Sequence, residues 1–182
     1  MFPKIFFDEY QICFIKEWIL THGAFKKVLI SNANVQSGQA VNFDFIPAIQ
    51  ELATRHPKTM FILTNKESSI NLKLNNIIYS SDIIKTSNMD LNENAYLGTF
   101  CDIIVGRASG PFTFCFNQDI LFNRDVKMIS FSFETKDYAH YLKADWLGEK
   151  LRDKIKYKAD IIHSSKRSGK EACNVIEGLL NE

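Results

Sequence analysis

A chain of 182 residues, 46% of them hydrophobic and 24% charged, has the size and composition of one globular domain with a hydrophobic core. The formal net charge of +1 at pH 7 gives no basic excess of the kind that binds nucleic acid, so we expect no nucleic-acid partner.

The four cysteines, Cys13, Cys101, Cys115 and Cys173, form no C-x-x-C pair, which argues against a zinc knuckle and favours reduced thiols. We expect no metal and no cofactor. No apolar run approaches the roughly 18–20 residues of a membrane span, and the first residues lack the order of a signal peptide. We therefore expect a cytoplasmic protein, and peripheral association with the inner face of the membrane stays open.

Apolar residues recur at helical spacing over residues 4–20, and Gly23 follows as a stop signal. This pattern predicts an amphipathic helix. We assign residues 1–25 to this helix and a linker, and residues 26–182 to the main domain.

Continuous apolar runs at 27–31, 59–64, 77–79, 102–105, 127–131 and 159–162 predict six strands. Helical segments are expected after 42–44, at 91–100, near Pro111 and at 167–181. Strands that are apolar throughout are typical of a parallel sheet covered on both faces. The sequence therefore predicts an α/β fold, a three-layer αβα Rossmann-like domain with a mostly parallel sheet.

Small and polar residues follow several of these strands, at 31–40, 64–67, 80–86 and 106–111. Ligands of parallel α/β sheets bind at the carboxyl ends of the strands. We therefore expect these loops to share one edge of the sheet and one ligand site.

The stretch 101–114 is the strongest candidate within that edge. A buried strand is expected to break at Gly106, and a helix to restart at Pro111, where its free N–H groups favour an anion. Arg107 offers a forked donor to a phosphate, and Gly110 lets a ligand approach the backbone. The alternative is an ordinary strand-to-helix connection. The three other polar loops on the same edge favour the phosphate cradle.

Several common catalytic motifs are missing. The sequence has no G-x-G-x-x-G, no Walker-type phosphate loop and no Asp-x-Asp pair. Ser109 does not sit in a nucleophile elbow, because Arg107 and Pro111 occupy its glycine positions. His140 is a possible base and Glu134 a possible ligand of a sugar hydroxyl, but an inert surface residue is the commoner outcome for each. We name no catalytic residue.

The order of features over residues 27–116 resembles the nucleotide-sugar-binding domain of GT-B glycosyltransferases. The likeness is to the peptidoglycan-precursor N-acetylglucosaminyltransferases and the lipopolysaccharide heptosyltransferases. It rests on the strand, small-residue loop, helix and strand order, and on the aspartate-led strand that ends in the turn Asp102-Ile-Ile-Val-Gly-Arg-Ala-Ser-Gly110. It implies a nucleotide-sugar donor as ligand.

The resemblance also implies the substrate-binding residues. At the turn and the helix after it, the diphosphate would be met by Arg107, Ser109, Gly110 and Thr113. The loop after the first strand would complete the cradle with Asn32, Asn34, Ser37 and Gly38. The segment 81–84, which includes Ser81 and Asp82, would flank the base.

Two departures from the family's pattern limit what is implied. Where the family often carries a glutamate for the donor ribose, this chain has Phe114, Cys115 and Phe116. A GT-B enzyme also has two such domains, and this chain supplies one. Three explanations fit: a donor domain from a longer enzyme, a subunit that works with a separate acceptor-binding subunit, or a non-catalytic α/β ligand-binding or interaction domain. The first two predict an apolar docking surface, for which the phenylalanine-rich segments 1–7 and 112–133 are candidates. A small-molecule hydrolase would depend on Ser109.

Overall fold

Six parallel strands form one sheet, in the order β3-β2-β1-β4-β5-β6. The computed structural model describes residues 2, 4–7, 12–36, 38, 40–70, 74–85, 90–132 and 157–182. The strands are β1 (Lys26–Ser31), β2 (Thr59–Leu63), β3 (Ile77–Tyr79), β4 (Ile103–Arg107), β5 (Lys127–Phe131) and β6 (Asp160–Ser164). Strands β2 and β3 are added on one side of β1, and β4, β5 and β6 on the other, so the strand order reverses between β1 and β4 and the topological switch point lies there.

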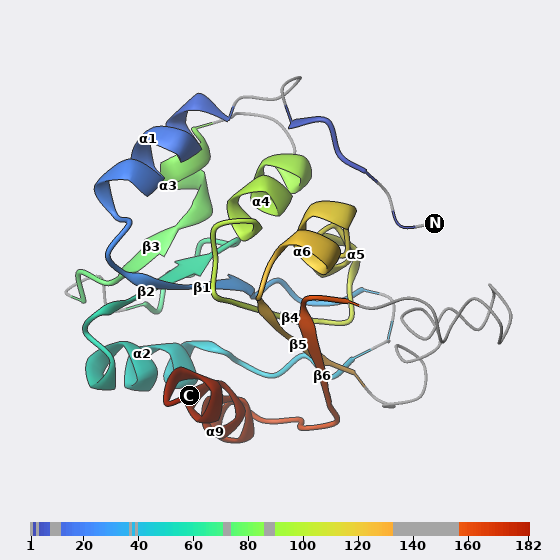
Figure 1. Cartoon of the computed structure of the whole chain (residues 1–182). Helices are drawn as coiled ribbons and strands as arrows, with labels where there is room; N and C mark the ends of the chain where they lie inside the picture. Colours follow the sequence, from blue (N-terminus) through green and yellow to red (C-terminus); the bar gives the residue numbers. More distant parts are fainter. Residues whose placement is uncertain are drawn as a thin grey trace, which may run out of the picture.

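Helices cover both faces of the sheet (Figure 1). One face carries α2 (Ile46–Arg55) and α9 (Gly169–Leu180). The other carries α1 (Cys13–Thr21), α3 (Ser80–Ile84), α4 (Leu91–Gly98), α5 (Gly110–Thr113) and α6 (Gln118–Asn123). The predicted three-layer α/β fold is therefore confirmed.

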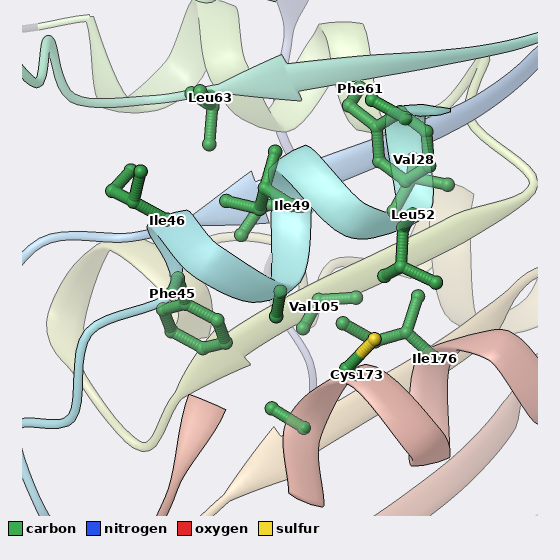
Figure 2. Packing of buried hydrophobic residues seen from close by; sticks show 14 of the residues in the cluster. Val28, Phe45, Ile46, Ile49, Leu52, Phe61, Leu63, Val105, Cys173 and Ile176 are labelled. Carbon is green, nitrogen blue, oxygen red and sulfur yellow. The ribbon is translucent and has the colours of Figure 1, made fainter. Parts of the chain in front are cut away.

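The two cores follow from the alternation of side chains along each strand. Val28 and Ile30 of β1 face α2 and α9, where Ile49, Leu52 and Ile176 close the first core (Figure 2). Leu29, between them, faces the second core under α1, α4 and α6. Ser31 follows Leu29 by two positions, so it lies on the same side of the sheet as Leu29.

Strand β4 runs two residues further than the sequence predicted. Gly106 pairs with Ser31 of β1 and Ser130 of β5, and Arg107 pairs with Phe131. The expected break at Gly106 is wrong. Packing requires a glycine at position 106. A Cβ there would lie 2.5 Å from the ring of Phe112, which is fully buried.

The N-terminal helix is shorter than predicted, since residues 4–6 are not helical and α1 begins at Cys13. Phe2 packs instead against α6, with its ring centroid 6.2 Å from that of Phe122. Ile15 of α1 is fully buried in the second core.

Candidate functional site

A crevice opens at the switch point, at the carboxyl ends of β1 and β4. We call it the β1–β4 crevice. Its volume is about 210 Å³. It is lined by Leu29, Ser31, Ala33, Thr64, Asn65, Asp90, Leu91, Asn94, Ile104, Pro111, Phe112 and Cys115. These residues come from β1, β4, the start of α4 and the short helix α5, together with the loops that follow β1 and β2. Open α/β sheets bind their ligands at this position.

Two buried polar atoms in the wall of the crevice have no hydrogen-bond partner. They are Oγ of Ser31, at the end of β1, and Oδ1 of Asn94, in the first turns of α4. The two residues are only 5% and 7% exposed, respectively. Buried polar groups in folded proteins nearly always have a partner, and leaving one unpaired costs free energy. Ser80, Ser81 and Ser130 also have buried hydroxyls without a partner, so what distinguishes Ser31 and Asn94 is that they line the crevice.

The rest of the crevice combines an apolar floor with a polar mouth. Leu29, Ile104 and Phe112 belong to the second core and form the floor. The half-buried Asp90 precedes α4 and its side chain caps no N–H group of that helix. Burial raises the pKa of the Cys115 thiol to about 12, so this cysteine stays protonated and is no nucleophile at neutral pH.

A second pocket, of about 280 Å³, lies on the other side of the segment that follows β1. We call it the Arg107 pocket. It is lined by Asn32, Asn34, Asn42, Phe43, Asp44, Phe45, Ile46, Glu67, Ser69 and Arg107. Residues 31 and 33 line the crevice whereas residues 32 and 34 line the Arg107 pocket, so this short segment separates the two.

Arg107 is 1% exposed, and its guanidinium is bonded to backbone carbonyls. Nη1 donates to the carbonyl oxygens of Asn32 and Ala33, both at 2.8 Å. Nε donates to the oxygen of Val41 at 3.2 Å, and Nη2 donates to the oxygen of Phe43. The guanidinium thus clamps the two ends of the loop between β1 and α2.

Two phenylalanine rings also hold the guanidinium. Its central carbon lies 4.9 Å from the ring centroid of Phe43 and 4.7 Å from that of Phe45. Burial lowers the pKa of Arg107, and the carboxylates of Asp44 and Glu67 act against that shift. An arginine remains charged under these conditions. Arg107 is therefore a buried cation that orders a loop, and the forked donor that we expected to face a phosphate faces the backbone instead.

The other predicted residues of the β1 loop lie near Arg107. The buried Asn32 donates from Nδ2 to the oxygen of Asn65 at 3.0 Å and accepts from the N–H of Asn65 at 2.9 Å, so its amide ties two loops together. Asn34 is exposed at the Arg107 pocket. Gly38 is exposed with a φ of 65°, a conformation that favours glycine. Ser37 lies outside the described residues.

The predicted residues after β4 lie beside the crevice. Ser109 is half-buried, while Gly110 and Thr113 are exposed next to Pro111 in the crevice wall. A Cβ at position 110 would meet nothing within 4 Å, so this surface is open. Oγ1 of Thr113 donates to the carbonyl oxygen of Ser109 at 2.7 Å.

Ser81 and Asp82 lie on α3, which follows β3 at the edge of the sheet, and neither lines the crevice or the Arg107 pocket. Asp82 pairs with Lys66 at 3.3 Å. The candidates Glu134 and His140 lie outside the described residues.

Asp102, which marks the GT-B likeness, lies at the opposite edge of the sheet from the crevice. Its Oδ2 accepts from the N–H of Lys27 at 2.7 Å, at the start of β1. In this structure the side chain of Asp102 therefore aligns two neighbouring strands.

Sequence reasoning included Ser31 only as the first residue of the loop 31–40, and it did not assign Asn94 or Asp90 to the candidate site. The only signal for Ser31 is its even spacing from Leu29, which places a hydroxyl on an otherwise apolar face. Asn94 looks like any polar residue of an amphipathic helix, and Asp90 like a helix cap.

No group of three or more His, Cys, Asp or Glu side chains in the described part of the chain is placed to hold a metal ion. Nor do the described residues include a helix with the length and hydropathy needed to cross a bilayer. Comparisons with protein-family models, with curated proteins and with solved structures found no match for the chain.

Proposed function

We propose that the chain is the donor-binding domain of a glycosyltransferase and that it binds a nucleotide sugar with one part of the ligand in the β1–β4 crevice. The observation that carries the proposal is the pair of unpartnered buried atoms, Ser31 Oγ and Asn94 Oδ1, in a crevice at the switch point of a parallel sheet. A nucleotide sugar carries hydroxyl groups that satisfy both atoms. The diphosphate would lie on the open surface formed by Ser109, Gly110 and Thr113, next to the crevice.

The negative charge that develops on the diphosphate during sugar transfer needs stabilisation. Among the described residues that line the crevice none is Lys, Arg or His. In this proposal the charge is met by backbone N–H groups of the turn after β4 and by a second domain or subunit, which also supplies the acceptor base. Phe6, Phe114 and Phe122 are 64%, 38% and 38% exposed, and each offers an apolar side chain to such a partner.

Calorimetric titration with a panel of nucleotide sugars and nucleoside diphosphates tests the proposal. We expect at least one nucleotide sugar to bind, and Asn94→Leu to weaken the binding. Asn92→Leu is the matched control, because Asn92 lies on the same helix α4 and does not line the crevice. Failure of every member of the panel to bind would contradict the proposal. Equal affinities for the wild type and Asn94→Leu would place the ligand outside the crevice.

A non-catalytic α/β ligand-binding domain is the second candidate. It is favoured by the backbone bonds of Arg107, because they occupy the guanidinium that was expected to meet the diphosphate. The two candidates differ over the diphosphate. A donor domain binds a nucleotide sugar more tightly than the corresponding sugar or nucleoside, whereas a binding domain of the second kind gains nothing from the diphosphate.

A further inference from the structure

The residues that line the crevice indicate which part of a nucleotide-type ligand the crevice can hold. Its described polar lining consists of the hydroxyls of Ser31 and Thr64, the amides of Asn65 and Asn94, and the carboxylate of Asp90. The remaining lining is apolar apart from the thiol of Cys115. The only formal charge in this lining is therefore the negative charge of Asp90.

The two unpartnered atoms, Ser31 Oγ and Asn94 Oδ1, and the half-buried carboxylate of Asp90 narrow the chemical class of the ligand further. Asn94 Oδ1 and the carboxylate of Asp90 only accept hydrogen bonds, and Ser31 Oγ both donates and accepts. A group that satisfies Asn94 and Asp90 must donate. Phosphate at neutral pH is mostly an acceptor, and its charge is repelled by Asp90. A ring that carries hydroxyl groups both donates to the two acceptors and accepts from Ser31.

The size of the crevice fits the same conclusion. Pockets for drug-sized ligands have volumes of roughly 300–1,000 Å³. The crevice, at about 210 Å³, has room for one ring but not for a whole nucleotide sugar. Its apolar floor, which includes Leu29, Ile104 and Phe112, suits the C–H face of such a ring.

From these observations we infer that the β1–β4 crevice is a subsite for one neutral, hydroxyl-bearing ring, a pyranose or a ribose, and that it excludes phosphate. Asn94 and Asp90 accept hydrogen bonds from ring hydroxyls, and Ser31 donates to a ring or hydroxyl oxygen. This inference rests on the proposed ligand site and specifies which part of the ligand enters it. Any phosphate of the ligand then lies outside the crevice.

Saturation-transfer NMR with neutral probes tests the inference directly. The probes are a set of methyl glycopyranosides and the common ribonucleosides, each at millimolar concentration, and inorganic pyrophosphate serves as the competitor. We expect at least one neutral probe to bind, with an affinity that does not change between low and high salt. We expect pyrophosphate not to displace it. Displacement by pyrophosphate would overturn the inference, and so would the failure of every neutral probe to bind.

Substitutions identify the subsite. A neutral hydrogen bond is worth about a two- to tenfold change in affinity, so we expect Asn94→Leu to weaken probe binding by that factor. A hydrogen bond to a charged group is worth about ten- to hundredfold, which is the loss that we expect for Asp90→Leu. Asn92→Leu is the matched control, because Asn92 lies on the same helix α4 and does not line the crevice. Equal effects of Asn94→Leu and Asn92→Leu would overturn the inference. Circular dichroism melts of all three variants exclude unfolding as the cause.

The result also separates this inference from the proposed function. Suppose that a nucleotide sugar binds, that pyrophosphate displaces it and that Asn94→Leu leaves its affinity unchanged. The ring subsite is then wrong, while a donor-binding function stands. If a neutral ring binds through Asn94 and the matching nucleotide sugar binds no tighter, the subsite stands and the glycosyltransferase proposal fails.

Discussion

The clamp formed by Arg107 makes a quantitative prediction for Arg107→Met. Methionine keeps an apolar chain of similar length but removes all donors, so the four carbonyl groups bonded by the guanidinium lose their partner. Two of these carbonyls belong to the buried residues Asn32 and Phe43. A buried acceptor without a partner costs about 1–3 kcal/mol, so the two together cost about 2–6 kcal/mol.

Removing the buried cation recovers part of this cost, because the charge no longer has to leave water. We therefore expect Arg107→Met to lower the free energy of unfolding by about 3 kcal/mol, which in a domain of this size lowers Tm by about 6–12 °C. Arg107→Lys should recover little of the loss, because one ammonium group cannot reproduce the planar fork that reaches four carbonyls.

Differential scanning calorimetry with a matched control checks the prediction. Arg55→Met makes the same chemical change at a side chain that is 41% exposed and pairs with Glu51 and Glu177. Exposed ion pairs contribute about 0–1 kcal/mol, so this control should lose no more than about 4 °C. A Tm for Arg107→Met within the range of the control would refute the clamp.

Three further predictions follow from packing and exposure. Gly106→Ala places a Cβ 2.5 Å from the ring of Phe112 and should lower the free energy of unfolding in urea by about 1–3 kcal/mol. Gly110→Ala, where the new Cβ meets nothing, should lower it by less than about 0.5 kcal/mol. Equal losses in the two variants would contradict the packing. Gly178→Ala, at an exposed position of α9 with open space around the new Cβ, should stabilise the protein by about 0.5–1 kcal/mol, and a lower urea midpoint would speak against this. A thiol reagent should label only Cys13 in the native protein, because the other three cysteines are buried, and it should label all four after unfolding. Rapid labelling of a second cysteine in the native protein would show that this burial is wrong.

The sheet was predictable from sequence because its strands are apolar on both faces. Each predicted strand matches an observed one to within two residues, and the parallel arrangement follows from the intervening helices. The helices α3 and α6, of 5 and 6 residues, were missed, since a segment of fewer than two turns shows no helical period. The end of β4 was missed because a glycine in a strand and a glycine at a turn look alike in the sequence.

The roles of the candidate site residues were harder to predict, and Arg107 shows why. A guanidinium at the end of a strand suits a phosphate or a set of carbonyls equally well. The carbonyls that Arg107 bonds belong to residues 32–43, more than 60 positions away in the chain. No local pattern shows that these carbonyls point inward. The sequence can therefore indicate that a donor is present, while only the fold shows which acceptors already use it.

The clamp and the crevice are connected through the segment after β1. Arg107 holds the carbonyls of Asn32 and Ala33 from one side, and on the other side Ala33 and the preceding Ser31 line the crevice. The side chain of Asn32 also fixes the backbone of Asn65, another crevice residue. The position of the unpartnered Ser31 hydroxyl therefore depends on a cation that does not line the crevice. If the crevice binds the proposed ligand, Arg107 is a positioning residue. It then contributes to ligand affinity through the backbone that it orders, whereas Asn94 contributes through direct contact.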